Sequence, residues 1–371
     1  MRTHLVSSDP RNFPVQCHRI LTLVCVLALS LVGAPSTRAQ ESQQEFANLG
    51  QCKLENGQVI QDCRIGYRTF GRLNAAGDNA VLMPTSLHGN TAELTQLFGD
   101  GRSPLHLVDT TRLFGIAVDA FGNGISSSPS NSPGQHGTEF PHFTLRDCVR
   151  AQHRLATEVL HLQHLHAVTG ISMGGEQTFV WAVMYPKYFD LAVPILGTPR
   201  ETTFDLLTKE IQMKAIESAP GYDDGHYTTE PDLRLANLID ALVVITPKYR
   251  NELTPRKQAT AYIHRAEMSD HADANDRLWQ LDAVRQLDVI GDRTISEAAH
   301  AEGPHFLVIV NRYDHTVNPQ PALDWAAAIG APTYVSQVPC GHSMMNCDAA
   351  AVSSRVRAFL IAGKLPEPHG Q

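Results

Sequence analysis

The chain has 371 residues, and its 30 Lys and Arg against 38 Asp and Glu give a formal net charge of −8; 43% of the residues are hydrophobic and 18% are charged. This composition is typical of a globular protein and excludes collagen-like and low-complexity chains. The acidic balance also lacks the basic footprint of a nucleic-acid-binding protein and shows no patch for an anionic membrane surface. We therefore expect neither nucleic acid nor, beyond the N-terminal segment, a membrane as partner.

The N-terminal segment has the pattern of a secretory signal peptide. An apolar stretch at 20–34 follows Arg11 and Arg19 and leads into small residues that end at Ala39. A membrane span needs about 20 apolar residues, which is longer than this stretch. We expect cleavage after Ala39, with Ala34 as the other candidate site and an uncleaved anchor as the alternative. The expected localisation is export to the periplasm or the medium.

Five cysteines follow this segment and would meet an oxidising space, where disulfides persist. Cys52 and Cys63 flank a turn-like Asn-Gly pair, so a bridge across a hairpin is plausible. Cys340 and Cys347 are close in sequence and can close a small loop. Cys148 stands among apolar residues at helical spacing, which indicates a buried, inert thiol.

Apolar runs and helical patterns alternate along residues 40–200. The chain order predicts a hairpin at 52–63, strands at 79–83 and 114–118, a helix at 144–162 capped by Thr144, a strand at 166–170, a helix at 176–185 and a strand at 191–196. Strands that alternate with helices predict an α/β fold, in which helices cover both faces of a mostly parallel sheet.

Residues 201–300 are polar and helical in pattern and lack strong strand runs, so they predict an inserted helical lid. The sheet resumes with strands at 305–310 and 333–338 and helices at 322–329 and 349–361. The expected organisation is a signal peptide at 1–39, the first part of the core at 40–200, the lid at 201–300 and the second part of the core at 301–371.

The sequence Gly170-Ile171-Ser172-Met173-Gly174 matches G-x-S-x-G, and it lies between an expected strand and an expected helix. This is the pattern of a nucleophile elbow, a sharp turn that exposes a serine hydroxyl above the sheet. The glycines leave room where the strand and the helix come close together. The alternative is a glycine-rich turn with an idle serine.

A serine hydroxyl is a weak nucleophile until a base accepts its proton, and an acid usually orients that base. Asp314 follows the run at 305–310, and His342 follows the strand at 333–338. Both loops should therefore meet Ser172 at one edge of the sheet, with His342 as general base and Asp314 as its partner. The alternatives are His315 as the base, and a helix cap or surface ion pair for Asp314.

Two backbone N–H groups should form an oxyanion hole for the charge that develops on the substrate. Met173 follows the nucleophile, and Leu87 lies in the loop after the strand at 79–83. In that loop Thr85 or His88 could instead offer a side-chain donor or line the acyl pocket, and a solvated loop histidine is the other reading of His88.

These residues resemble the homoserine O-acetyltransferase family of the α/β-hydrolase superfamily. The segments that carry the resemblance are Tyr67–Asn74, Asp78–Leu82, Phe140–Asp147, Gly170–Gln177 and Asp273–Asn275, together with Asp314 and His342. The resemblance implies the α/β-hydrolase fold with a lid, Ser172, Asp314 and His342 as a catalytic triad, and Leu87 as an oxyanion amide.

The chain departs from that family where an amino-acid acceptor is held. Ser343 stands where the family has Asp, Arg277 stands where it has Tyr, an Ala-Arg pair expected near Arg234 is missing, and the His-Ala-Leu-Thr-Gly run is Thr85–Gly89 here. These departures and the expected export favour a serine hydrolase of esters acting on a small acyl compound. An O-acyltransferase and a non-catalytic binding protein on the same fold are the alternatives. We expect no cofactor or metal, since the metal reading of His161, His164 and His166 has no cysteine nearby.

Overall fold

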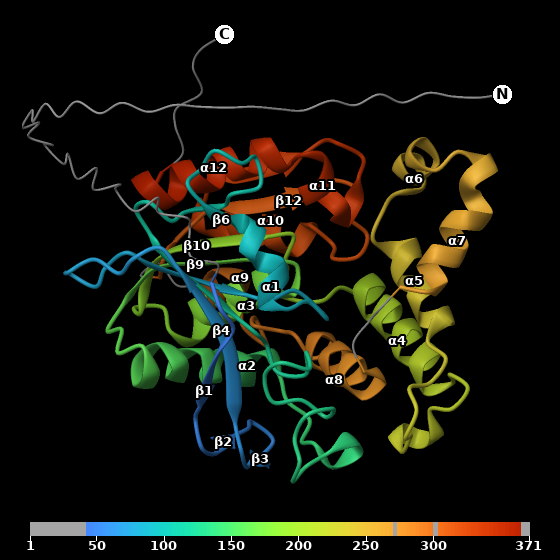
Figure 1. Cartoon of the computed structure of the whole chain (residues 1–371). Helices are drawn as coiled ribbons and strands as arrows, with labels where there is room; N and C mark the ends of the chain where they lie inside the picture. The colour runs from blue at the N-terminus through green and yellow to red at the C-terminus, as the bar shows by residue number, and fades with distance from the viewer. Residues whose placement is uncertain (1–41, 270–272, 300–302, 365–371) are drawn as a thin grey trace, which may run out of the picture. The chain divides into compact units, whose positions relative to one another are not determined.

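A central sheet organises the computed structural model, which describes residues 42–269, 273–299 and 303–364 (Figure 1). Its strand order is β1-β4-β8-β5-β9-β10-β12-β13, with β11 beside β10. The strands are β1 (Glu45–Asn48), β4 (Arg64–Phe70), β5 (Ala80–Pro84), β8 (Phe114–Val118), β9 (Leu165–Ile171), β10 (Phe189–Ile195), β11 (His305–Phe306), β12 (Val308–Asn311) and β13 (Thr333–Ser336). Two small pairs stand apart: β2 (Cys52–Lys53) with β3 (Val59–Ile60), and β6 (Phe98–Gly99) with β7 (Val108–Asp109).

The strands from β8 to β13 run parallel, whereas β1 and β4 are antiparallel to their neighbours. The predicted α/β fold is confirmed, and so are the predicted strands of the parallel part. The run predicted at 305–310 is divided at Leu307 into β11 and β12, and both pieces lie beside β10. The antiparallel strands β1 and β4 were not predicted, because polar residues such as Arg64 and Arg68 interrupt their apolar pattern.

Helices cover both faces of the sheet because successive strand side chains point to opposite sides. Leu82 and Val168 face one apolar cluster with α3 and α10, while their neighbours Val81 and Ala167 face a second cluster with α12. The helices of these layers are α1 (Thr91–Leu94), α2 (Leu145–Arg154), α3 (Met173–Met184), α10 (Gln320–Ile329), α11 (Met344–Cys347) and α12 (Ala349–Ala362).

The two helices that flank β9 show how local sequence fixes their ends. Thr144 caps α2 as predicted, in a capping box with Asp147, but the helix ends at Arg154 and a π-turn at Leu155–Val159 follows. Helix α3 begins at Met173, earlier than the predicted 176, because the glycines of the elbow are already helical.

Between β10 and β11 the described residues form helices and loops and, apart from an isolated bridge at Asp288, no strand. The helices are α4 (Thr203–Glu217), α5 (Arg234–Val243), α6 (Pro247–Leu253), α7 (Ala259–Glu267), α8 (Ala274–Arg285) and α9 (Ile295–Ala299). Figure 1 shows α4, α5, α6 and α7 to one side of the sheet. Helix α9 packs instead against α10 and α3 of the core. The lid boundaries at 201 and 300 stay a prediction.

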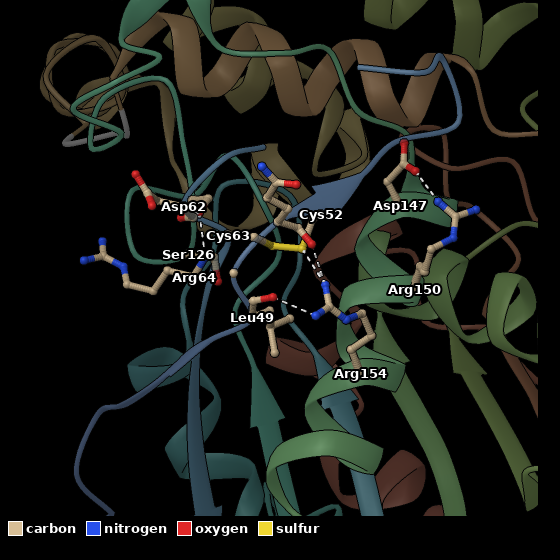
Figure 2. The surroundings of a disulfide bond; sticks show 12 residues. Leu49, Cys52, Asp62, Cys63, Arg64, Ser126, Asp147, Arg150 and Arg154 are labelled. Atoms are coloured by element: carbon tan, nitrogen blue, oxygen red, sulfur yellow. Dashed lines mark hydrogen bonds and ion pairs between the residues drawn. A yellow bond between two sulfur atoms is a disulfide. The ribbon is translucent and has the colours of Figure 1, made fainter. Parts of the chain in front are cut away.

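Both expected disulfides are present, Cys52–Cys63 and Cys340–Cys347, and Cys148 is a buried free thiol whose pKa is raised by burial. Figure 2 shows how Arg154 of α2 reaches the hairpin that contains the first disulfide. The Arg154 guanidinium donates to the carbonyl of Leu49 at 2.6 Å and to that of Gln51 at 2.8 Å. The cross-linked hairpin is thereby tied to α2.

The signal peptide expected at 1–39 lies outside the described residues. Within the described ranges, none of the helices combines the length and the apolar character that a membrane crossing requires.

Candidate active site

Ser172 occupies the sharp turn between β9 and α3. Its backbone has φ 58° and ψ −125°, a conformation that non-glycine residues rarely adopt, and its N–H donates to the carbonyl of Ile195 at 2.8 Å. A Cβ on Gly170 would lie 2.3 Å from the backbone of Gly174, and one on Gly174 would lie 2.5 Å from the carbonyl oxygen of Pro84. The glycines are therefore required by close packing, as expected for a nucleophile elbow.

The structure brings the three predicted side chains together. His342 Nε2 lies 2.8 Å from Ser172 Oγ, and His342 Nδ1 lies 2.7 Å from Asp314 Oδ2. With Nδ1 protonated, the imidazole donates to the carboxylate and presents a lone pair to the serine hydroxyl. The arrangement can accept a proton from Ser172 and keep the resulting imidazolium paired with a negative charge.

Asp314 is buried and is oriented by its own loop. Its Oδ1 accepts hydrogen bonds from the N–H groups of Thr316 at 2.9 Å and Val317 at 3.1 Å, which leaves Oδ2 for His342. The aspartate is thus neither a helix cap nor part of a surface ion pair. His315, the alternative base, has Nδ1 at 3.3 Å from the carbonyl of Tyr313. The structure places His342, and not His315, beside Ser172.

His342 lies in a short 3₁₀ turn, Gly341–Ser343, that separates β13 from α11. The Cys340–Cys347 disulfide closes the loop that contains this turn. Thr246, the N-cap of α6, donates its hydroxyl to the carbonyl of Pro339, so the helical insertion also contacts the loop.

The two predicted oxyanion amides lie in neighbouring segments. Met173 is the first residue of α3, and the loop that holds Leu87 is bound to the end of β9 by Ser86, whose hydroxyl donates to the carbonyl of Ile171 at 3.1 Å. In the turns and loops that the structure describes, neither the Met173 N–H nor the Leu87 N–H donates to a backbone carbonyl. No backbone acceptor in these segments competes with a substrate oxygen for the two amides.

Other residues of that loop have structural contacts. The Thr85 hydroxyl is buried and accepts from the N–H of Ala120 at 3.1 Å, so it supports the loop and does not face a substrate. The backbone N–H of His88 donates to Gln280 Oε1 at 2.7 Å, which joins the loop to α8.

Buried ionisable residues near the triad were not predicted. Burial raises the pKa of Glu176 well above its usual range, and it raises the pKa of Glu201 to about 7. For Glu201 the Lys209 ammonium opposes this rise, while the Asp205 carboxylate adds to it. The available sequence signal was Glu176 itself, the one charged residue of the elbow helix α3. No group of three His, Cys, Asp or Glu side chains in the described parts of the chain could hold a metal ion.

Comparison with known proteins places this geometry in a family. The model of the alpha/beta hydrolase fold family matches residues 96–345, which is more than half of the chain. The chain belongs to the α/β hydrolase fold family. The homoserine O-acetyltransferase of Moorella thermoacetica is 32% identical over 280 residues, covering 66% of this chain and 74% of that protein. The predicted resemblance to homoserine O-acetyltransferases is thereby confirmed.

Esterases are similar as well. The ethyl acetate hydrolase of Pseudomonas veronii is 38% identical over 185 residues, which cover 49% of this chain and 52% of the relative. The chain thus matches about half the length of that relative. The solved structure of an acetylester hydrolase from Corynebacterium glutamicum is 25% identical, with a TM-score of 0.78, and covers 86% of this chain and 96% of its own. Because these relatives are enzymes of the same fold, the chain is an α/β-hydrolase-fold enzyme.

Proposed function

We propose that the protein is an exported serine esterase that hydrolyses small acyl esters through an acyl-enzyme on Ser172. The observation that carries this proposal is the continuous chain of hydrogen bonds from Ser172 through His342 to Asp314. The similarity to an ethyl acetate hydrolase and to an acetylester hydrolase supports a short acyl group.

In the first half-reaction Ser172 Oγ attacks the ester carbonyl carbon while His342 Nε2 takes the hydroxyl proton. The amides of Met173 and Leu87 stabilise the negative oxygen of the tetrahedral intermediate. The intermediate then expels the alcohol, whose oxygen receives the proton from His342, and the acyl group stays on Ser172. Asp314 keeps its negative charge throughout and stabilises the imidazolium.

In the second half-reaction water takes the place of the alcohol, and the same steps release the carboxylic acid. The positions that hold an amino-acid acceptor in homoserine O-acetyltransferases are engaged differently here. Arg277 is buried and pairs with Asp240 at 2.7 Å, and Ser343 accepts a hydrogen bond from Asn346 at 3.1 Å. These contacts favour water over an amino-acid acceptor. The Moorella relative keeps O-acyl transfer as the second candidate.

Export is part of the proposal. Two disulfides in a chain of this size support an oxidising compartment, and they agree with the signal-like segment at 20–34.

The test compares the mature protein with Ser172→Ala, with Ser218→Ala on the exposed end of α4 as the control. We expect a fluorophosphonate probe to label the wild type and the control but not Ser172→Ala, and hydrolysis of p-nitrophenyl acetate to fall at least about 10³-fold in Ser172→Ala alone. Product analysis with and without an added alcohol separates hydrolysis from transfer. Labelling that survives the loss of Ser172 would overturn the proposed nucleophile.

A further inference from the structure

The turn that contains Leu87 holds a histidine in an unusual backbone conformation. The Gly89 N–H donates to the carbonyl of Ser86 at 3.0 Å, which closes a β-turn. Leu87 and His88 are its two central residues, and His88 has a φ of 60°. A positive φ at the third residue is typical of type II turns, where glycine is preferred because it has no Cβ. A histidine in this position costs free energy unless a contact compensates for it.

Gln280 of helix α8 supplies such a contact. Its side chain is 0% exposed, its Oε1 accepts from the His88 N–H at 2.7 Å, and its Nε2 donates to the carbonyl of Phe121 at 2.8 Å. A backbone N–H can only donate and a carbonyl can only accept, so these two partners fix which way the amide of Gln280 points. The side chain is therefore held at both ends, with its oxygen directed at the turn.

Leu87 lies between two residues that are anchored to different parts of the fold. On one side, the Ser86 hydroxyl donates to the carbonyl of Ile171 at the end of β9. On the other side, the His88 N–H is held by Gln280. An oxyanion hole works only when its N–H donors point at the developing charge before the reaction begins. The orientation of the Leu87 N–H therefore depends on both of these anchors.

Helix α8 is itself firmly held, so Gln280 has a rigid base. Arg277, one turn earlier on the helix, pairs with Asp240 of α5 at 2.7 Å. Trp279 Nε1 donates to the carbonyl of Phe140 at 3.0 Å, in the segment before α2. The helix is thus bonded both to the helical insertion and to the core, and a contact from it restricts the turn.

We propose that Gln280 is a positioning residue that aligns the Leu87 amide with the oxyanion of the tetrahedral intermediate by holding the turn at His88. The inference rests on the proposed function. Gln280 exchanges no proton and touches none of the reacting atoms. Its effect arises in the transition state, when negative charge develops on the substrate oxygen.

The experiment measures kcat and KM for p-nitrophenyl acetate in the mature protein and in Gln280→Met. The variant keeps the length of the side chain and removes both hydrogen-bonding groups. Active sites are counted with a fluorophosphonate probe, so that kcat refers to folded enzyme. We expect kcat to fall about 10–100-fold while KM changes less than about twofold, because the oxyanion is stabilised only in the transition state.

Trp279→Phe is the matched control. It removes a buried hydrogen bond between the same helix and the core, at Phe140, and leaves the turn untouched. It should lower the melting temperature as Gln280→Met does, while its kcat per active site stays within about twofold of the wild type. An equal loss of kcat in both variants would show that α8 acts only through stability and would overturn the proposal, as would an unchanged kcat in Gln280→Met.

A double variant tests whether Gln280 acts through the turn. Glycine adopts the φ of 60° without strain, so in a His88→Gly background the loss caused by Gln280→Met should shrink to less than about threefold. The comparison is made against His88→Gly alone, which removes any effect of the imidazole itself. A loss of the same size in both backgrounds would contradict an action through His88.

If Gln280→Met does not fold, amide hydrogen exchange in the wild type decides. We expect the His88 N–H to exchange at least about 100-fold more slowly than the Leu87 N–H, and the Leu87 N–H to slow when a trifluoromethyl ketone is bound to Ser172. Equal rates for the two amides in the free protein would overturn the proposal. A wild type without esterase activity would refute the proposed function, and exchange at His88 would still test the contact with Gln280.

Discussion

Ser172 and His342 share a hydrogen bond, but the two turns that position them are stabilised in different ways. The serine turn is fixed by close backbone packing, with glycines where any Cβ would collide with a neighbouring segment. The histidine turn lies in a loop after the edge strand β13, and a disulfide closes that loop. Noncovalent packing therefore suffices beside the central strand β9, whereas the edge of the sheet uses a covalent bond.

The variant Gly170→Ala tests whether close backbone packing fixes the serine turn. The new Cβ would lie 2.3 Å from the backbone of Gly174, which no side-chain movement can relieve. We expect a loss of about 4 kcal/mol or more in the free energy of unfolding and no measurable esterase activity. Chemical denaturation and the ester assay measure both. Gly134→Ala is the control, because nothing lies within 4 Å of its Cβ, and it should behave as the wild type.

The link between the two regions is tested by Asp314→Asn. The amide preserves shape but reverses the hydrogen bonding at His342 Nδ1, so the imidazole no longer presents its lone pair to Ser172. We expect kcat to fall about 10⁴-fold with little change in melting temperature. Asp324→Asn on the exposed side of α10 is the control and should keep full activity. A fall of less than tenfold would show that Asp314 does not orient the base.

The double variant Cys340→Ser and Cys347→Ser tests whether the disulfide positions the histidine turn. Freeing the loop broadens the positions open to His342, so we expect kcat to fall several-fold while the protein stays folded. Loss of the cross-link should also lower the free energy of unfolding by about 2–3 kcal/mol. Stopped-flow acylation and thermal melting separate the two effects. Unchanged acylation in the folded double variant would show that packing alone holds His342.

The sequence predicted the parts of this comparison that depend on local pattern. The amino-acid sequence alone shows the elbow motif, the ends of the strands before Asp314 and His342, and the spacing of both cysteine pairs. The antiparallel strands β1 and β4 were missed because polar residues such as Arg64 and Arg68 interrupt their apolar pattern. The buried acids Glu176 and Glu201 were missed because each is buried only by the packing of segments that are distant in sequence. Periodicity locates secondary structure, but it does not show which charged side chains tertiary packing will bury.

The remaining disulfide gives the matched control for the histidine loop and the smallest expected effect on catalysis. Cys52–Cys63 cross-links a hairpin that Arg154 ties to α2, and within the described ranges this hairpin makes no hydrogen bond to the triad. The double variant Cys52→Ser and Cys63→Ser should lose about 2–3 kcal/mol of stability, as the other pair does, since the closed loops are similar in length. Its kcat and pH profile should match those of the wild type. Equal losses of kcat in both double variants would mean that a disulfide supports activity only through global stability. A loss confined to the Cys340–Cys347 variant would assign to that bond the local role of holding His342 toward Ser172.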